Sequence, residues 1–152
     1  MPRGELSLYF DPKSLAAVYA KLNQLSEIER DAVINKGLSD GAGIIRRETN
    51  KNMHNKVKRR KGNLYSSLSK LKRRNSKKWG PAYYVGFKRP KGAAAHLIDK
   101  GTNERWTKKG YYRGKVTPRL FHTQSVERKG EEALRRVEES IRISIERIMN
   151  RN

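Results

Sequence analysis

The sequence contains no cysteine, which excludes both a disulfide framework and a metal site built on thiolates. It also lacks long apolar runs. The longest stretch without a formal charge is the nine residues 79–87, whereas a membrane-spanning helix needs about 20 apolar residues. No apolar signal region follows the start of the chain, Met1-Pro2-Arg3-Gly4. We therefore expect a soluble protein whose fold depends on packing alone.

Acidic residues are scarce, since 15 Asp and Glu stand against 36 Lys and Arg and give a net charge of +21. The imbalance is concentrated in residues 46–91, which hold 17 basic residues and one acidic residue, Glu48. Like charges at this density repel one another and cost stability unless an anionic partner offsets them. This basic middle is therefore expected to face either nucleic acid phosphates, bound without sequence preference, or an acidic protein.

Apolar residues make up only 35% of the chain, close to the 34% that are charged. This composition indicates a thin core, a long mobile arm, or stability provided by neighbouring subunits. We predict a single domain over residues 1–152, because this length suits one core and leaves little room for a second. Residues 1–25 are expected to form an N-terminal strand and helix extension, and residues 26–152 the core.

A long amphipathic helix is predicted from about residue 26 to about residue 54, where apolar residues recur with a period near 3.6. Ser26 and Glu29 have the spacing of a capping box at its start. Gly37, Gly41 and Gly43 each weaken a helix by up to about 1 kcal/mol relative to alanine. Their presence indicates close packing against another helix, or a kink.

A second long helix of about thirty residues is predicted at the end of the chain. Thr117 offers an N-cap and Pro118 suits the first helical position. An apolar stripe follows at helical spacing, with Ala133, Leu134, Val137, Ile141 and Ile145 among its members. We expect this stripe to support assembly, so that Ile141→Asp would abolish it.

Short strands are predicted between and before these helices. Residues 6–10 alternate as in a strand, and Asp11-Pro12 then starts a short helix. Residues 82–87 form the strongest predicted strand, and another strand is predicted near Tyr111-Tyr112. After a break at Gly62-Asn63, a short helical stripe is predicted from Leu64, Tyr65, Leu68 and Leu71. Residues 93–98 suit one or two helical turns, and residues 70–78 and 101–115 suit basic loops. The predicted class is α+β, with two long helices packed on a small, mostly antiparallel sheet.

Three short motifs occur in a fixed order after the first long helix. Residues 62–64 read Gly-Asn-Leu, residues 96–102 read His-Leu-Ile-Asp-Lys-Gly-Thr, and residues 118–121 read Pro-Arg-Leu-Phe. From about residue 26 to residue 149 this order resembles the neck and tail-component proteins of tailed bacteriophages. Those proteins commonly show a Thr-Gly-Asn-Leu turn, an acidic-aromatic-Gly-Thr turn and an Arg-Pro-Phe-Leu helix start. The chain departs from that pattern at Lys61, at Lys100 and in the order Pro118-Arg119. The motif residues are Gly62, Asn63, Leu64, Asp99, Gly101, Thr102, Pro118 and Phe121.

The resemblance implies a virion structural protein, assembled in the host cytoplasm, that forms a ring of six or twelve copies in the phage neck. Genomic double-stranded DNA would pass through the ring, and adjacent connector and tail proteins would contact it. No cofactor and no catalytic role are implied. The alternative is a freestanding nucleic-acid-binding protein, ribosomal-like or nucleoid-like, indicated by the charge and by eight of the twelve aromatic residues lying in residues 65–112.

The candidate contacts to DNA or to an acidic ring are basic residues in and after the basic middle. They are Lys58, Arg59, Arg60, Lys61, Lys72, Arg73, Arg74, Lys77, Lys78, Lys88, Arg89, Lys91, Lys108, Lys109 and Arg113. Trp79 and Trp106, each beside charged residues, are the aromatic contact candidates, whereas Tyr83, Tyr84 and Phe87 fit the two faces of a half-buried strand.

Catalytic patterns are weak. The histidines His54, His96 and His122 are far apart in sequence and none begins a recognised ligand spacing. His96, Asp99 and Glu104 could form a metal site, but a polar turn that anchors the Gly101-Thr102 corner is favoured. We expect no enzyme activity and no metal site.

Overall fold

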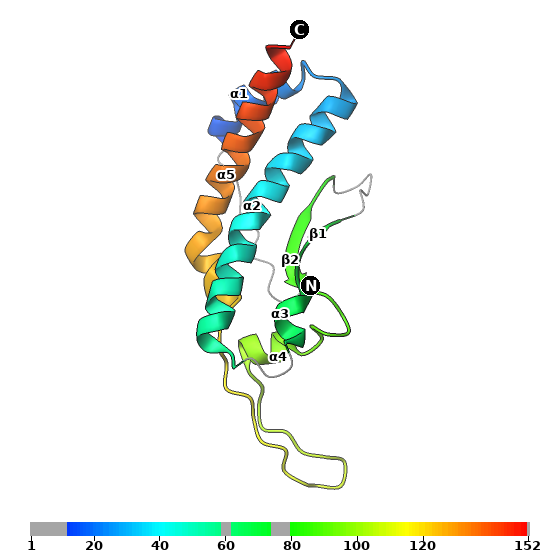
Figure 1. The fold of residues 1–152 in the computed structure, drawn as a ribbon, viewed down its shortest axis with the longest axis vertical. Coiled ribbons are helices and arrows are strands. Elements are labelled where there is room, and N and C mark those ends of the chain that lie inside the picture. The colour runs from blue at the N-terminus through cyan, green and yellow to red at the C-terminus, as the bar shows by residue number, and fades with distance from the viewer. Residues whose placement is uncertain (1–11, 59–61, 74–79, 152) are drawn as a thin grey trace.

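The computed structural model describes residues 12–58, 62–73 and 80–151. Its elements, in chain order, are α1 (Pro12–Leu22), α2 (Glu27–Lys56), α3 (Asn63–Ser67), β1 (Leu68–Lys72), β2 (Tyr83–Phe87), α4 (Ala95–Lys100) and α5 (Thr123–Met149). The helices α2 and α5 lie side by side and antiparallel, and the sheet lies along α2 (Figure 1). The predicted α+β class, with two long helices and a small antiparallel sheet, is confirmed. The strand predicted at residues 6–10 lies outside the described residues.

The first long helix has the predicted cap. The Glu29 backbone N–H donates to Ser26 Oγ at 3.4 Å, and the Ser26 N–H donates to Glu29 Oε2 at 3.1 Å, which is a capping box. The helix ends at Lys56 because Val57 adopts an extended conformation, with φ −120° and ψ 122°. Both ends lie within two residues of the sequence-based boundaries.

Close helix packing explains two of the three glycines in α2. A Cβ at Gly37 would lie 2.6 Å from Ile141 Cγ1, and a Cβ at Gly41 would lie 2.8 Å from the Ala133 carbonyl oxygen. Gly43 faces open space, because a Cβ at this position would meet no atom of a packed neighbour within 4 Å. Gly37 and Gly41 therefore let the backbones of α2 and α5 approach, whereas Gly43 has no such role.

The core is divided along the helix pair. At the end near the C-terminus, α1, α2 and α5 share the buried residues Leu22, Leu25, Val33, Val137, Ile141 and Ile145. At the opposite end, Met53, Phe121 and Leu68 pack together, so that α2, the start of α5 and β1 meet. The apolar stripe of α5 thus fills the inside of the chain's own fold and, apart from half-buried Leu134, is not exposed on the outside.

In the described part of the chain the sheet consists of β1 and β2, which are antiparallel, with Leu68 opposite Phe87 and Lys72 opposite Tyr83. The helical stripe predicted to continue through Leu68 and Leu71 is therefore wrong, as is the loop predicted to begin at Lys70. Pairing with β2 outweighs the helical spacing here, because it buries Leu68 against Met53 and Phe121. Lys70 Nζ also donates to the Ser39 carbonyl at 3.0 Å, which ties β1 to α2.

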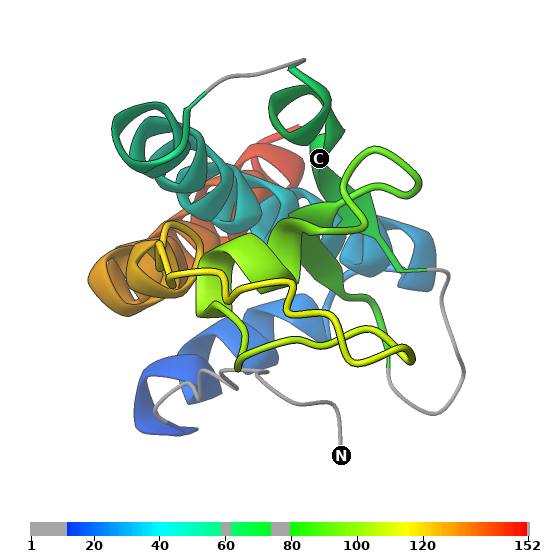
Figure 2. The same ribbon diagram turned by 90° about the horizontal axis from the view of Figure 1, so that it is seen from below.

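A strand was also predicted at Tyr111-Tyr112, and there the structure has only an isolated bridge between Trp106 and Tyr112. The short helix predicted at residues 93–98 is confirmed as α4. Figure 2 views the molecule from below and shows α4 and the segment after it lying under the helices and the sheet.

The last helix begins at Thr123, so the predicted start at Thr117-Pro118 is wrong. Leu120 has a positive φ of 50°, which interrupts helical geometry just before that start. The chain is held here by α4, since the N–H groups of Arg119 and Leu120 both donate to the Asp99 carbonyl. No helix in the described part of the chain is both long and apolar enough to cross a bilayer.

Candidate nucleic-acid interface and assembly surfaces

A basic cleft of about 970 Å³ lies where α2 ends, beside α3 and α4. Among the described residues that line it, four are cationic, namely Lys56, Lys58, Lys91 and Arg119, and none is acidic. Asn55 and Asn63 add polar side chains to the lining of this cleft. A cleft of this composition attracts anions, because its cations are not neutralised within the cleft.

The elbow after α2 gives this cleft its shape. Tyr65 of α3 donates a hydrogen bond of 2.5 Å to the Val57 carbonyl, and its ring meets the His54 ring edge to face at 4.7 Å. Gly62, with φ 73°, takes the left-handed conformation that turns the chain into α3. On the far wall, the Arg119 N–H donates to the Ile98 carbonyl at 3.0 Å, which places Arg119 against α4.

The structure brings only some of the predicted contact residues together. Lys58 and Lys91 line the basic cleft. Lys72 and Lys88 lie at opposite ends of the sheet, because Lys72 ends β1 while Lys88 follows β2. Arg73 and Arg89 extend these two ends, and Lys108, Lys109 and Arg113 lie further away, in the segment between α4 and α5. Arg59, Arg60, Lys61, Arg74, Lys77, Lys78 and Trp79 lie outside the described residues.

Two cleft residues were missed by the sequence reasoning. Lys56 lies in the basic middle but was not among the candidate contacts. It is the last residue of α2, and its Nζ donates to Gln124 Oε1 of α5. Arg119 lies far from the basic middle in sequence and was noted only as part of a turn motif. Its position depends on the contact between the chain before α5 and α4, and no local pattern indicates that contact.

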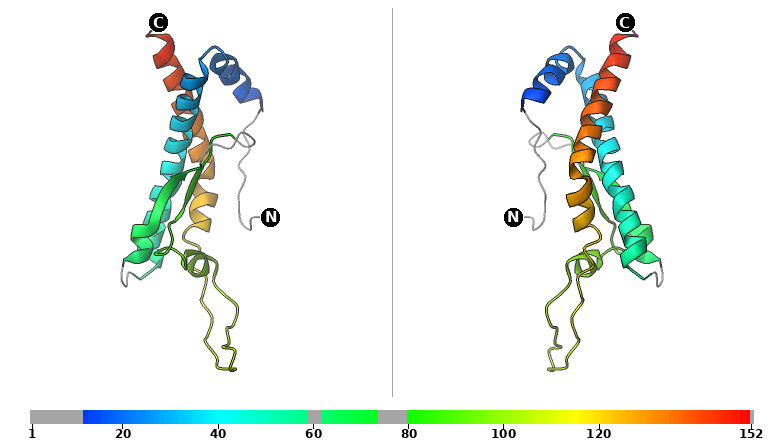
Figure 3. Two further views of the ribbon diagram at one scale, coloured as in Figure 1. Left: turned by 90° about the vertical axis from the view of Figure 1, so that its right-hand side faces the viewer. Right: turned by 90° about the vertical axis from the view of Figure 1, so that its left-hand side faces the viewer.

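Residues 101–118, which we call the finger, project beyond the end of the helix pair, away from the C-terminus (Figures 1 and 3). Backbone bonds join its two sides: the Thr102 N–H donates to the Val116 carbonyl at 3.0 Å and the Thr107 N–H donates to the Tyr111 carbonyl at 2.8 Å. Gly101, at φ 74°, starts the finger, where a Cβ would lie 2.7 Å from the Val116 carbonyl oxygen. The predicted loop is therefore a bonded hairpin-like projection.

Aromatic side chains lie on the outside of the finger. The exposed fractions are 60% for Trp106, 69% for Tyr111 and 54% for Tyr112. Trp106 and Tyr112 face each other across the finger, with ring centroids 4.9 Å apart. Large aromatic residues with this exposure favour contact with another molecule.

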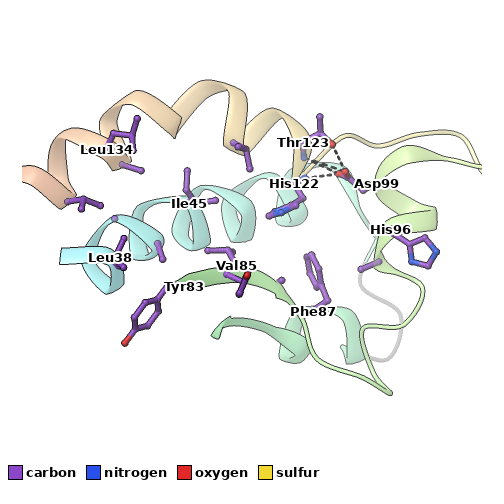
Figure 4. Close-up of a pocket in the computed structure, with 18 of the residues that line it drawn as sticks. Leu38, Ile45, Tyr83, Val85, Phe87, His96, Asp99, His122, Thr123 and Leu134 are labelled. Carbon is purple, nitrogen blue, oxygen red and sulfur yellow. Dashed lines mark hydrogen bonds between the residues drawn. The ribbon is translucent and has the colours of Figure 1, made fainter. Parts of the chain in front are cut away.

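A second cavity, of about 510 Å³, is a largely apolar groove between β2 and the two long helices. Figure 4 shows Leu38 and Ile45 of α2, Leu134 of α5, and Val85 and Phe87 of β2 around it. We call this the sheet–helix groove. Its end near α4 carries His96, Asp99 and His122.

The polar end of this groove is structural. The Asp99 carboxylate accepts hydrogen bonds from the His122 N–H at 2.7 Å and from the Thr123 hydroxyl at 2.6 Å. Asp99 therefore caps α5, while the Gly101-Thr102 corner that it was predicted to anchor is held by Val116. Among the described residues, no cluster of His, Asp and Glu has the grouping needed to hold a metal ion.

His122, at the α4 end of the groove, has a pKa that its surroundings shift. Burial lowers its pKa below the ordinary value, the charge of Asp99 opposes that effect, and Lys100 adds to it. Its Nδ1 lies 3.1 Å from the hydroxyl oxygen of Thr49, which is fully buried in α2. The neutral form of His122 therefore suits this packing position.

Comparisons of the chain with protein-family models, with curated proteins and with solved structures give no match.

Proposed function

We propose that this chain is a virion structural protein, a subunit of a closed ring of six or twelve copies in the neck of a tailed bacteriophage. The observation that carries the proposal is the finger, which projects from the body and has exposed Trp106, Tyr111 and Tyr112 on it. A projection that buries few of its own aromatic residues gains stability by contacting a neighbour.

The motif order that resembles phage neck and tail-component proteins coincides with turns that position the finger and the last helix. Gly62 and Gly101 both have positive φ, 73° and 74°. Phe121 is fully buried, and Asp99 caps α5. These motif residues thus have physical roles at the places where the resemblance expects turns, which supports the proposal.

The basic cleft and the basic finger give the proposed subunit its anionic partners. Genomic DNA that passes through the ring, or an acidic face of an adjacent connector or tail protein, would meet these cations. Contact with DNA would be independent of sequence, because phosphates carry no base identity. No catalytic step is part of this function.

The first experiment is to measure the mass of the particles that the purified chain forms, by mass photometry at moderate salt, followed by electron microscopy. The proposal expects closed rings, either of the chain alone or together with an adjacent connector protein. A chain that stays monomeric at every salt concentration and is absent from virions would contradict it.

A second candidate function is a freestanding nucleic-acid-binding protein. It is favoured by the basic cleft, whose described lining residues include four cations and no carboxylate. The two functions differ in symmetry. A freestanding binder would remain a monomer and bind RNA or DNA tightly at low salt, whereas a neck subunit would be recovered in particles of fixed subunit number.

A further inference from the structure

We propose that, in the ring, the finger of one copy occupies the sheet–helix groove of the next copy. This inference rests on the proposed ring and adds which surfaces make its repeated contact. The partner is a second copy of this chain. Three features of the described residues support the pairing: the exposed aromatic residues of the finger, the apolar lining of the groove, and the opposite charges around them.

The finger and the groove match in polarity. Trp106, Tyr111 and Tyr112 are each more than half exposed, and burial of one aromatic side chain removes about 150–250 Å² from water. The groove offers Leu38, Val85 and Leu134 from three different elements, in a cavity of about 510 Å³. Aromatic side chains of the finger would therefore gain an apolar environment there.

The charges of the finger and of α5 are complementary, whereas Lys100 lines the end of the groove near α4. Residues 101–118 hold five basic residues and one acidic residue, Glu104. Three glutamates of α5 are spaced around the groove residue Leu134: Glu127 is seven positions before it, Glu131 three positions before it and Glu138 four positions after it. These spacings put them on the same side of the helix as Leu134.

These three glutamates have no internal ion-pair partner among the described residues. Glu132 and Glu139, which lie elsewhere on α5, are paired with Lys129 and Arg136. No ion pair between described residues includes Glu127, Glu131 or Glu138. The groove is therefore bordered by carboxylates that can pair with the exposed finger cations Arg105, Lys108, Lys109, Arg113 and Lys115.

The geometry favours contact between copies. The finger extends past the end of the helix pair, whereas the groove lies alongside β2 and α5 within the body (Figures 1 and 4). A finger that leaves its own subunit and enters a different surface of the next one makes a heterologous contact. Repetition of such a contact closes a ring when the rotation between copies allows it.

The test uses the absence of native cysteine. A Tyr111→Cys chain that carries an affinity tag is mixed with an untagged Leu134→Cys chain, assembled, and exposed to a mild oxidant. We expect a disulfide-linked pair of one tagged and one untagged chain. The matched control replaces Leu134→Cys with Ile28→Cys. Ile28 is 83% exposed and lies at the start of α2, outside the groove lining, so this control is expected to give no linked pair. Ala42→Cys, a smaller change in the same groove, replaces Leu134→Cys if that variant does not fold.

The outcomes separate the two proposals. Rings that form normally but give no more linked pairs than the Ile28→Cys control overturn the finger contact and leave the ring intact. A chain that stays monomeric both alone and with an adjacent connector protein, and that is absent from virions, overturns both. In a further mixture, the double variant Leu8→Cys/Leu134→Cys replaces the Leu134→Cys chain. If its two cysteines join within one chain and the link to Tyr111→Cys is lost, the groove belongs to the chain's own residues 6–10, and the inference is overturned.

Charge reversal provides an independent measurement. Glu131→Lys with Glu138→Lys is expected to raise the concentration needed for half-assembly about tenfold at low salt. Adding Lys108→Glu and Lys109→Glu in the same chain should reverse most of that effect. Equal assembly of all three proteins would overturn the proposed charge pairing and with it the placement of the finger.

Discussion

The hydroxyl of Thr123 donates a hydrogen bond of 2.6 Å to the carboxylate of Asp99, a residue 24 positions earlier in the chain. Asp99 also accepts from the His122 N–H, so that a side chain of α4 satisfies the first backbone donors of α5. The residue at the N-cap position, His122, makes no side-chain cap of its own. The Asp99 carboxylate thus fixes the start of the last helix, while the Asp99 backbone carbonyl accepts from the N–H groups of Arg119 and Leu120, which follow the finger.

Replacing this carboxylate should destabilise the fold. We expect Asp99→Ala to lower the free energy of unfolding by about 2 kcal/mol, because it removes a helix cap and leaves buried donors unpaired. Urea denaturation followed by circular dichroism measures the change. Glu104→Ala, at an exposed position in the finger, is the control and should stay within about 0.5 kcal/mol of the parent. Equal effects of the two substitutions would show that Asp99 is not an important cap.

The glycines of α2 provide a matched pair of substitutions. Gly41→Ala should lower the free energy of unfolding by about 1–3 kcal/mol, because its methyl group would meet the Ala133 backbone and a Val137 methyl. Gly43→Ala should raise it by up to about 1 kcal/mol, since the methyl enters open space and alanine favours the helix. Thermal denaturation of the two variants should therefore shift the midpoint in opposite directions. Shifts of the same sign would contradict the described contact between α2 and α5.

The stability of the chain should fall as the pH drops through the range in which histidine titrates. Burial lowers the pKa of His122 from its ordinary value of 6.5, so below that value the unfolded chain binds a proton that the folded chain does not. Stability from this group is complete above the unfolded pKa and decreases as the pH falls below it. Carboxylic acids titrate near pH 4, so measurements between about pH 7.5 and about pH 5.5 isolate the histidine effect.

The corresponding variant is His122→Gln, which should reduce the dependence of unfolding free energy on pH in this range. Asn103→Gln, at an exposed position in the finger, is the control and should leave that dependence unchanged. If the parent shows no decrease in stability between these pH values, the assignment of a buried neutral His122 is wrong.

The basic cleft makes a prediction about salt dependence. The triple variant Lys58→Gln, Lys91→Gln and Arg119→Gln should reduce the slope of log affinity against log salt by about 0.9 for each phosphate of duplex DNA that it no longer neutralises. Fluorescence anisotropy with a random-sequence duplex over a series of salt concentrations gives this slope. Lys21→Gln, at an exposed position in the last turn of α1, is the control. An unchanged slope would remove the cleft from the DNA-binding surface.

The position of Ile141 changes what its substitution tests. From the sequence, Ile141→Asp was expected to abolish assembly, but Ile141 is buried within the subunit beside Gly37. A carboxylate there has no described partner and should unfold the subunit, since an unpaired charge in an apolar core is strongly destabilising. Disappearance of the helical circular dichroism signal at 25 °C would accompany any failure to assemble. A folded Ile141→Asp chain would contradict this placement.

The features that the sequence predicted are those set by local spacing. The period of the apolar residues indicated both long helices, and Ser26 with Glu29 indicated where α2 begins. The glycine cluster indicated either close helix packing or a kink, and the structure has close packing at Gly37 and Gly41 but not at Gly43.

The features that were missed depend on contacts between distant parts of the chain. Leu68 and Leu71 fit helical spacing, but pairing with β2 makes them part of a strand. Thr117-Pro118 has the local pattern of a helix start, but the positive φ of Leu120 and the distant Asp99 place that start at Thr123. Arg119 joins the basic cleft for the same reason, since its location depends on its backbone bonds to α4.

The close approach at Gly37 and Gly41 has a mechanical consequence. Two helices whose backbones touch at fixed points cannot easily slide past each other, so α2 and α5 behave as one stiff rod. The 30 residues of α2 give this rod a length of about 45 Å. The finger lies at one end of it, where α2 ends beside the basic cleft, and α1 with the C-terminus lies at the other end (Figure 1). Partners bound at the two ends would therefore be kept at a constant separation set by the number of turns in α2, and each inserted turn would lengthen it by about 5.4 Å.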